Sequence, residues 1–354
     1  MIVSPGSTIG IVGGGQLGRM LSVAAAQLGY KCHIFDPHED PPAAHVAAKF
    51  TRAAYDDRDA LERFAAEVDV VTYEFENLPV EPLSGIGEKL RPGTRSLAVA
   101  QDRAVEKTFI EDCDAAVAPW RAVESIDDVT AAVTELGTPL VLKTRRYGYD
   151  GKGQAWIRSP DEAGNAWAAI AGEPAVAEQG VDFAAEFSVI VARWADGTTT
   201  FWDSPDNVHR EGILRTSTVP PGPPIADQVE QARSAAARIA EALGHIGVLT
   251  VEFFASRTGP LVNEIAPRVH NSGHWTIEGA FTSQFEQHIR AICGLPPGST
   301  ALACSSARMD NLIGEEIGGW HELLADPCAH VHIYGKGEAR PGRKMGHVTR
   351  IDLK

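Results

Sequence analysis

Two glutamates, Glu252 and Glu264, stand at equal distances on either side of Thr258, so a β-hairpin with its loop at 257–259 would place their carboxylates directly opposite each other. A three-residue loop of this kind favours glycine at its left-handed position, which Gly259 supplies. Opposed carboxylates repel each other unless a cation lies between them, and ligands made only of oxygen select a hard cation such as Mg²⁺. The alternative is two solvated glutamates, but their neighbours in both strands are apolar, and charged residues are seldom buried unless paired. The pair therefore predicts a magnesium site.

A glycine-rich stretch, residues 147–154 with the sequence YGYDGKGQ, follows a strand-like segment that contains Lys143. Glycines let backbone N–H groups approach phosphate oxygens closely, and Lys143 or Lys152 can offset the phosphate charge. The stretch lacks the Gly-Lys-Ser/Thr ending of a P-loop, and a plain turn is the usual explanation for such a sequence. Upstream of a carboxylate hairpin, however, it favours a flexible phosphate-binding loop.

Residues 266–274, with the sequence APRVHNSGH, begin two residues after Glu264 and could bind a second anion. Arg268 could hold a planar anion through two parallel hydrogen bonds. His270 and Asn271 could position a neighbouring substrate, although a single histidine of this kind is often a hydrogen-bonded core residue. The concentration of these residue types beside a metal strand favours a substrate site.

A small basic patch near the end of the chain stands out in an otherwise acidic protein. A local positive charge of this kind suits one phosphate monoester better than a polymer. The alternative is a solvated run of charges. The patch consists of Arg340, Arg343 and Lys344.

Gly13, Gly15 and Gly18 satisfy the pattern G-x-G-x-x-G, and Asp36 lies about where a ribose-binding acid would stand. Taken alone, this pattern indicates a nicotinamide or flavin enzyme. The alternative is a tight turn from a strand into a helix, whose N-terminus can accept any phosphate. Because the later clusters describe phosphate transfer, we assign the glycines to the substrate side of the molecule and expect that Asp36 binds no NAD.

The elements that must position these groups follow from the hydrophobic pattern. In the first hundred residues apolar strand-like runs alternate with helical patterns, which predicts a parallel sheet in an α/β domain. Mixed strands and helices follow, and the Pro- and Gly-rich segments 78–92 and 294–297 mark boundaries. The expected strands are 8–12, 31–35, 68–75, 139–144, 186–191, 248–254, 261–265 and 330–334, and the expected helices are 16–28, 58–67, 226–243 and 276–292.

Composition argues against several classes of protein. The 354 residues are 44% hydrophobic and 22% charged, and the apolar runs fall short of the roughly 18 residues that span a bilayer, so neither a membrane protein nor a disordered chain is expected. The net charge of −15 repels phosphate backbones, which argues against nucleic-acid binding. The five scattered cysteines form no Cys-x-x-Cys pair, which argues against a disulfide framework or a zinc site. The N-terminus lacks the basic region of a secretory signal, so we expect a cytoplasmic protein.

In this order the motifs resemble those of ATP-grasp enzymes, and most closely those of the branch that carboxylates aminoimidazole ribonucleotide. The matching motifs cover nearly the whole chain: GGQLGRM at 14–20, YEFEN at 73–77, QDR at 101–103, GYDGKGQ at 148–154, EQG at 178–180, NEIAPRVHNSGH at 263–274 and RPGRKMGH at 340–347. The resemblance implies an ATP-grasp fold, of class α/β and α+β. It would have an N-terminal parallel-sheet (pre-ATP-grasp) domain at 1–100, an ATP-grasp domain at 101–296 with a lid at about 105–177, and a small C-terminal domain at 297–354.

The resemblance also implies roles for individual residues. ATP would contact Arg103, Lys143, Gly148, Tyr149, Asp150, Gly151, Lys152, Gly153, Gln154, Glu178, Gln179, Gly180, Val181, Glu186, His209, Asn263 and Glu264. The ribonucleotide would contact Gly15, Gln16, Leu17, Glu76, Arg268, His270, Asn271, Arg340, Arg343 and Lys344. Catalysis would involve Arg268, Tyr149, Asp150 and Lys152, and Mg²⁺ would bind to Glu252 and Glu264.

The reaction implied by the resemblance belongs to purine biosynthesis. Bicarbonate attacks the γ-phosphoryl group of ATP to give carboxyphosphate and ADP, and carboxyphosphate then delivers CO₂ to the exocyclic amine of the ribonucleotide. Because carboxyphosphate is short-lived in water, the glycine loop should close over it. The expected ligands are ATP, Mg²⁺, bicarbonate and the ribonucleotide, and the expected assembly is a homodimer. One position departs from many ATP-grasp carboxylases, since Ala266 stands where they place an asparagine ligand.

Three alternatives remain open. The first is another ATP-grasp ligase, such as a biotin carboxylase-like or glycinamide ribonucleotide enzyme. The second is a Rossmann oxidoreductase built on the first glycine motif. The third is a nucleotide-sensing module that binds ATP but releases no ADP.

Overall fold

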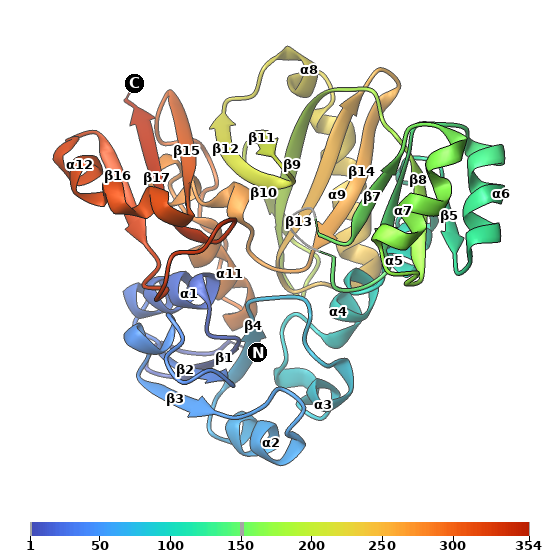
Figure 1. Cartoon of the computed structure of the whole chain (residues 1–354). Helices are drawn as coiled ribbons and strands as arrows, with labels where there is room; N and C mark the ends of the chain where they lie inside the picture. Colours follow the sequence, from blue (N-terminus) through green and yellow to red (C-terminus); the bar gives the residue numbers. More distant parts are fainter. Residues whose placement is uncertain (1, 149–151, 354) are drawn as a thin grey trace.

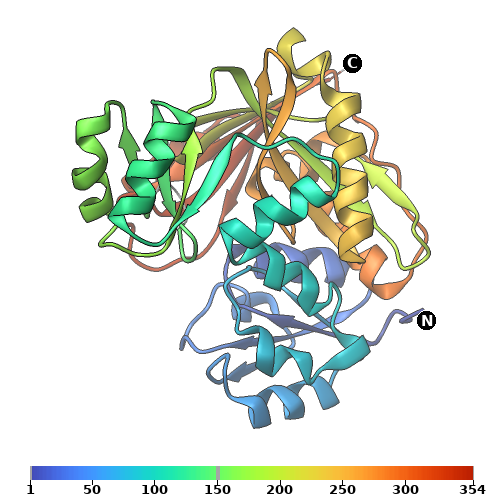
Figure 2. The same ribbon diagram turned by 90° about the vertical axis from the view of Figure 1, so that its right-hand side faces the viewer.

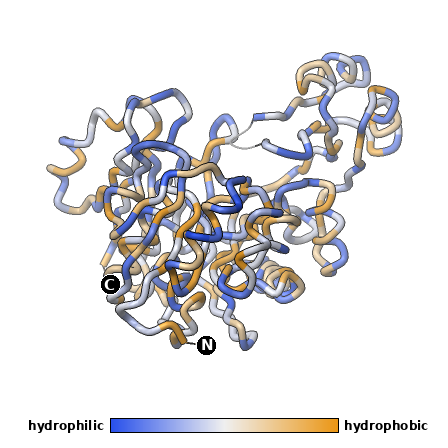
Figure 3. The backbone as a smooth tube through the Cα atoms, turned by 90° about the horizontal axis from the view of Figure 1, so that it is seen from below, coloured by the Kyte–Doolittle hydropathy of each residue, from blue (hydrophilic) through white to orange (hydrophobic). Residues whose placement is uncertain are grey.

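The computed structural model describes residues 2–148 and 152–353, and the strands of these residues form three sheets. Figure 1 shows the N-terminal sheet at the bottom, the long central sheet in the middle and the small third sheet at the right. No helix within these residues is long and apolar enough to cross a membrane. Figure 3 shows hydrophobic and hydrophilic stretches interleaved along the tube.

The N-terminal sheet confirms the predicted alternation of strands and helices. Its strand order is β3-β2-β1-β4, and all pairs are parallel. One face packs against α2 through an apolar cluster that includes Phe35 and Phe64, and the other face shares a core with α1 and with the distant helix α11. The elements are β1 Thr8–Val12, α1 Gln16–Gln27, β2 Lys31–Asp36, η1 Ala44–Val46, β3 Lys49–Arg52, α2 Arg58–Ala66, β4 Val70–Tyr73, α3 Val80–Ser84, η2 Gly87–Lys89, α4 Thr94–Ala100 and α5 Arg103–Asp112.

The third sheet is small and antiparallel, with the order β5-β8-β6-β7. Helices α6 and α7 cover it through their own apolar cluster. Ser125 caps the start of α6 by accepting from the N–H of Asp128, and Gly137 ends that helix with a positive φ. The elements are β5 Trp120–Val123, α6 Ile126–Leu136, β6 Leu140–Thr144, β7 Gln154–Ile157, η3 Pro160–Glu162, α7 Ala163–Ala169 and β8 Ala175–Gln179.

The central sheet has the order β14-β13-β9-β11-β12-β15-β17-β16, with β10 paired to β9. Because β15 pairs with β12, the C-terminal strands continue the central sheet. Figure 2 shows α9 along the central sheet and α4 and α5 between that layer and the N-terminal sheet. The elements are β9 Phe183–Arg193, β10 Thr199–Phe201, β11 Asp206–Arg210, β12 Ile213–Val219, α8 Pro223–Ala226, α9 Val229–Leu243, β13 Gly247–Ser256, β14 Gly259–Ala266, η4 Asn271–Gly273, α10 Thr276–Gly279, α11 Gln284–Cys293, β15 Ser306–Ile313, η5 Gly314–Gly319, α12 Trp320–Ala325, β16 Ala329–Ile333 and β17 Lys344–Asp352.

The predicted hairpin is present, but the prediction of its loop was wrong. Ser256 pairs with Gly259, so the loop has two residues instead of three. The Ser256 hydroxyl stabilises this tight turn by donating to the carbonyl of Gly259 and accepting from the N–H of Thr258. The extra residue is instead accommodated at Asn263, where the register shifts in a β-bulge. This bulge restores the predicted pairing of Glu252 with Glu264.

The predicted helix 276–292 is broken into α10 and α11. Between them Ala280 forms a β-bridge with Leu302, and the N–H of Phe281 donates to the carbonyl of Ala301. Ser283 then starts a new helix, because its side chain accepts from the N–H of Glu286. The hydrophobic period of the segment could not reveal this interruption, since the bridging residues come from a distant part of the chain.

Two fully buried histidines join the N-terminal sheet region to the central sheet. Nδ1 of His288 accepts from the N–H of Val248 at 3.0 Å, so its Nε2 carries the proton that faces Thr72 Oγ1 at 2.8 Å. His245 contacts the carbonyl of Val248 through Nε2 and the hydroxyl of Ser96 through Nδ1. Burial lowers the pKa of His288 to about 3 and that of His245 to about 4. Both rings therefore bridge the domains in the neutral form.

We expect the free energy of unfolding to fall as the pH drops from 6.5 toward 4. In the unfolded chain His288 binds a proton near its ordinary pKa of 6.5, whereas in the folded chain it does so only near 3. Proton uptake by the unfolded state thus costs stability by about 1.4 kcal/mol per pH unit for each such histidine. Urea unfolding at several pH values measures this slope.

The control for this experiment is Thr72→Val, which removes a partner of His288 without removing the titrating group. His288→Gln should reduce the slope of the free energy of unfolding against pH by the contribution of about one proton. Thr72→Val should lower the free energy of unfolding and keep that slope. An unchanged slope in His288→Gln would contradict the assignment.

Candidate active site

The two glutamates of the hairpin lie on one face of the central sheet, because they are directly opposite each other in the register of β13 and β14. The Glu252 side chain is 13% exposed and that of Glu264 is 40% exposed. Burial and the charge of Glu264 raise the pKa of Glu252 to about 7. The pair is therefore a site of concentrated negative charge that a cation would stabilise.

Arg103, the first residue of α5, reaches the same pair. Its Nη1 lies 3.0 Å from Glu264 Oε2. Asp102 caps α5 by accepting from the N–H groups of Ala104 and Val105, and Arg145 donates to both Asp102 oxygens at 2.9 Å. Since Arg145 directly follows β6, this contact fixes the start of the glycine loop to the start of α5.

A buried carboxylate, Glu178 at the end of β8, is held by two lysines. Lys143 Nζ lies 2.9 Å from Glu178 Oε2, and Lys107 Nζ lies 2.7 Å from Oε1. Although burial opposes ionisation, the two ammonium groups lower the pKa of Glu178 to about 2. Lys143 also donates to Asn263 Oδ1 at 3.2 Å, so it links the small third sheet to the bulge in β14.

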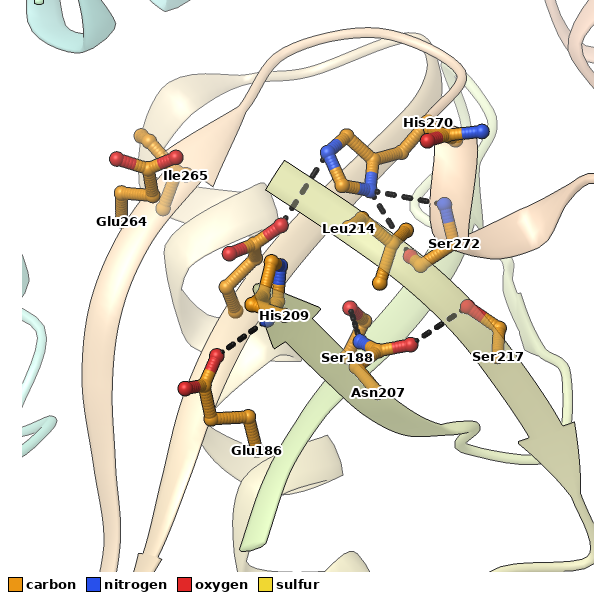
Figure 4. A network of polar contacts seen from close by, with 12 residues as sticks. Glu186, Ser188, Asn207, His209, Leu214, Ser217, Glu264, Ile265, His270 and Ser272 are labelled. Atoms are coloured by element: carbon orange, nitrogen blue, oxygen red, sulfur yellow. Dashed lines mark hydrogen bonds and ion pairs between the residues drawn. The ribbon is translucent and has the colours of Figure 1, made fainter. Parts of the chain in front are cut away.

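Glu186 and His209 form an ion pair on neighbouring strands β9 and β11, with 2.5 Å between Oε2 and Nδ1. Figure 4 shows this pair on the same side of the sheet as the other polar contacts. Burial disfavours the charged imidazole, but Glu186 and the charge of Glu252 raise the pKa of His209. The pairing with Glu186 therefore favours the charged form of this imidazole near the paired glutamates.

Arg268 lies just beyond β14 and pairs with Glu76, which comes from the N-terminal region after β4. Arg268 Nε donates to Glu76 Oε2 at 2.5 Å, and Nη1 donates to the carbonyl of Val269 at 3.1 Å. Burial opposes the charged form of Arg268, but Glu76 raises its pKa. The pair joins the N-terminal and central parts of the chain at the site.

His270 connects the paired glutamates to the next segment, as Figure 4 shows. Its Nδ1 accepts from the N–H of Ser272 at 3.3 Å, so the ring proton of the neutral form lies on Nε2, which is 3.2 Å from Glu252 Oε1. Burial and the charge of Arg268 lower the pKa of His270 well below its ordinary value. His270 therefore faces the site as a neutral hydrogen-bond donor.

Asn271 is buried in a pair with Asn311 of β15. The two amides exchange hydrogen bonds of 2.9 and 2.8 Å. Asn311 also donates to the carbonyl of Leu214 at 2.9 Å. The Asn271 side chain therefore anchors the segment after β14 to the C-terminal strands.

Lys344 is the first residue of β17, and its positive charge acts on the residues of the candidate site. Burial raises the pKa of Glu252 and lowers that of His270, whereas it opposes the net pKa shifts of Glu76 and His209. The charge of Lys344 acts to lower the pKa of all four groups. The other two basic residues of the patch lie farther out, in the loop before β17. Both contact Glu338, Arg340 through its carboxylate and Arg343 through its carbonyl.

The first glycine motif is already occupied by a carboxylate of the chain. Glu74 accepts from the N–H groups of Gly15 at 2.6 Å and Gly18 at 2.8 Å. A Cβ on Gly15 would lie 2.5 Å from a Glu74 oxygen. Asp36 accepts from the N–H of Gly14 at 2.7 Å and from Tyr55. These contacts explain the glycines and Asp36 without a dinucleotide.

The remaining predicted residues surround the glycine loop and the end of β8. Tyr149, Asp150 and Gly151 lie outside the described residues. Gln154 begins β7 opposite Lys143, and Gly153 has a φ of +69°. Gln179 donates to the carbonyl of Leu136, and Gly180 to that of Pro139. Half-buried or buried positions are Gln16, Leu17, Gly180 and Val181, and exposed positions are Lys152, Gly153 and Gln154.

Sequence reasoning missed Asp102, Glu106, Lys107, Arg145 and Glu74. The spacing of Glu106 and Lys107 from Arg103, three and four residues along one helix, places all three on one side of α5 and could have indicated them. Glu74 and Arg145 carried no such signal, because their partners lie far away in the chain.

Family models match three consecutive parts of the chain. A ribonucleotide synthetase preATP-grasp domain matches residues 6–101, an ATP-grasp domain matches 108–285, and a phosphoribosylaminoimidazole carboxylase C-terminal domain matches 307–353. The chain is 50% identical, over 99% of its length and 97% of the relative's, to N5-carboxyaminoimidazole ribonucleotide synthase of Brucella melitensis. It is also 46% identical to part of the bifunctional purine synthesis protein purC/E of Dictyostelium discoideum, of which it spans 37%.

Solved structures with bound ligands share the fold. The N5-carboxyaminoimidazole synthetase of Staphylococcus aureus complexed with ADP superposes with a TM-score of 0.94 at 38% identity, over 99% of this chain and 95% of that one. The N5-carboxyaminoimidazole synthase of Aspergillus clavatus in complex with ADP and 5-aminoimidazole ribonucleotide superposes with a TM-score of 0.92 at 29% identity, over 98% of this chain and 94% of that one.

Proposed function

Because the chain belongs to the N5-carboxyaminoimidazole ribonucleotide synthases of the ATP-grasp superfamily, we infer that it is an enzyme that carboxylates aminoimidazole ribonucleotide with ATP in purine biosynthesis. The observation that carries this inference is the match of one chain, over nearly its full length, to a relative of that name. We further propose that bicarbonate is the carbon source and that ADP and phosphate are released.

The nucleotide would lie between the small third sheet and the central sheet. Lys143, Arg103 and the glycine loop supply positive charge and N–H donors for its phosphates, which accords with the contacts of Lys143 to both sheets. The end of β8, from Glu178 to Val181, would face the base, and Glu186 with His209 would face the ribose. The ion pairs of Glu178 with Lys143 and of Glu186 with His209 support this assignment, because they fix polar groups before the ligand binds.

The donor set fits magnesium. Within residues 2–148 and 152–353 no group of three or more His, Cys, Asp or Glu side chains is arranged to hold a metal ion. Mg²⁺, however, is commonly bound by one or two carboxylates together with substrate phosphates and water. Glu252 and Glu264 provide two oxygen ligands, and the raised pKa of Glu252, caused by burial and by Glu264, indicates negative charge that a cation would relieve. A bound Mg²⁺ would neutralise phosphate charge during phosphoryl transfer.

The reaction would proceed in two balanced steps. A bicarbonate oxygen attacks the γ-phosphorus of ATP, the bond to the β,γ-bridging oxygen breaks, and ADP leaves. Carboxyphosphate then breaks into CO₂ and phosphate, and the exocyclic amine of the ribonucleotide attacks CO₂ and loses a proton. Arg268 would hold the carboxyphosphate, since a guanidinium pairs well with planar anions. Tyr149, Asp150 and Lys152 of the glycine loop would close over it and exclude water.

The ribonucleotide would be bound by residues of the N-terminal, central and C-terminal regions of the chain. Glu76, His270 and Asn271 would surround its aminoimidazole, with the neutral His270 as a hydrogen-bond donor. Its phosphate would contact Lys344, Arg340 and Arg343 together with the segment 15–17, in which the N–H of Gly15 already donates to Glu74. The charge that Lys344 exerts on Glu76 and His270 supports this arrangement. We also propose a lid at about 105–177 and a cytoplasmic location. The proposed assembly is a homodimer, and sedimentation velocity can test this oligomeric state.

The assay for this function measures ADP release with and without each substrate. ADP release that requires Mg²⁺, bicarbonate and aminoimidazole ribonucleotide together supports the proposed reaction. Release driven by biotin or by a glycinamide acceptor would instead indicate another ATP-grasp ligase, and ATP binding without release would indicate a sensing module. Tight NADH binding without ATP affinity would favour an oxidoreductase, which the occupied glycine motif argues against.

A further inference from the structure

Helix α5 directs three charged side chains toward the nucleotide side of the site. Arg103 pairs with Glu264, and Lys107 pairs with Glu178. Between them lies Glu106, which is 2% exposed. Its position three residues after Arg103 and directly before Lys107 places it against β14, the strand that carries Glu264.

Glu106 forms a hydrogen bond with the backbone next to Glu264, the proposed metal ligand. Its Oε1 accepts from the N–H of Ile265 at 2.7 Å, and Ile265 directly follows Glu264. Burial raises the pKa of Glu106 to about 8, with Arg103 opposing and the charge of Glu264 adding to the rise. The buried side chain of Glu106 therefore serves as a hydrogen-bond acceptor for the backbone of β14.

The bulge at Asn263 explains why a side chain is needed at this place. β14 is the outer strand of the central sheet, and the N–H of Val262 donates outward to the carbonyl of Ala116 at 2.7 Å. Regular alternation would direct the N–H of Glu264 outward next. Because Asn263 is an extra residue, the outward N–H is instead that of Ile265, and Glu106 satisfies it.

We propose that Glu106 is a positioning residue that fixes the bulged segment of β14 and thereby the direction of the Glu264 carboxylate. This inference rests on the proposed function, in which Glu264 binds Mg²⁺ with ATP. The required property of Glu106 is a buried hydrogen-bond acceptor, not a third metal ligand. A glutamine can supply such an acceptor, and a leucine cannot.

The test compares Glu106→Gln and Glu106→Leu with the parent enzyme, with Glu111→Leu on the exposed side of the same helix as the control. Mg²⁺ titrations of ADP release give the half-saturating concentration, and circular dichroism monitors folding. We expect the half-saturating Mg²⁺ concentration of Glu106→Gln to stay within about threefold of that of the parent. For Glu106→Leu we expect this concentration to rise by about tenfold or more. Glu111→Leu should match the parent.

A double mutant separates positioning from general loss of structure. In a Glu264→Gln background the metal ligand is already impaired, so adding Glu106→Leu should change the Mg²⁺ requirement little. Equal effects in both backgrounds would overturn the inference, as would parent-like behaviour of Glu106→Leu. If Glu106→Leu does not fold, Glu106→Gln decides: a tenfold loss there would mean that the carboxylate charge is needed. A parent enzyme without Mg²⁺-dependent ADP release would refute the proposed function itself, and this inference with it.

Discussion

Replacing Glu264 by Gln is expected to lower kcat/KM for ATP by about 100-fold or more, because it removes one of two carboxylate charges from the proposed magnesium site while keeping the shape of the side chain. Ala266 provides no further oxygen ligand at the position where many ATP-grasp carboxylases have asparagine. The site therefore has little to compensate for the loss. Titrations of ATP and Mg²⁺ in the ADP-release assay measure the effect.

The stability of this variant should change little. Glu264 is 40% exposed, and its ion pair with Arg103 contributes about 1 kcal/mol or less. The substitution also removes repulsion from Glu252, whose pKa is raised by burial and then by Glu264, so that pKa should fall in the variant. Urea unfolding checks stability, and Glu230→Gln, at a glutamate that is 86% exposed, is the control. Parent-like activity of Glu264→Gln would show that the metal assignment is wrong.

Replacing Arg268 by Ala is expected to abolish carboxylation, with a loss of about 100-fold or more, and to leave ATP affinity largely unchanged. Arg268 pairs with Glu76 from the N-terminal region, whereas Lys143 and Glu178, the proposed nucleotide contacts, pair with each other. The two groups therefore serve different parts of the site. Calorimetric titration with ATP and a product assay measure the two properties separately.

The alanine variant also leaves Glu76 without its cation, which should cost about 3 kcal/mol of stability. Arg268→Lys is the informative partner variant, because it keeps the charge beside Glu76 but loses the planar fork that can pair with carboxyphosphate. We expect the lysine variant to regain most of the stability and little of the activity. Weakened ATP binding with normal turnover at saturating ATP would assign Arg268 to the nucleotide pocket instead.

Local patterns predicted the elements well where short-range physics determines them. The strand 8–12 and the helix that begins at Gln16 are present, and the pairing of Glu252 with Glu264 is as predicted. That pairing results from a shorter loop combined with a bulge, two departures that compensate each other. The spacing of the glutamates thus predicted their register better than it predicted the turn.

The rest depends on partners that are distant in sequence. The break between α10 and α11 arises from contacts with residues 301 and 302, and the C-terminal strands join the central sheet through β12. Glu74 carries no local signal that it caps the first glycine motif, since its partners lie more than fifty residues away. Such pairings are decided by the tertiary fold and not by the period of a segment.

The strand order of the central sheet has a consequence for biosynthesis on the ribosome. β17 lies between β15 and β16, and it begins with Lys344, which belongs to the proposed ribonucleotide site. A nascent chain can form its N-terminal parallel sheet early, but the sheet edge beyond β15 stays open until residue 352 has left the exit tunnel. Translation that stalls before this point would therefore yield a folded but inactive intermediate with an unpaired strand, which is a target for chaperones and for aggregation.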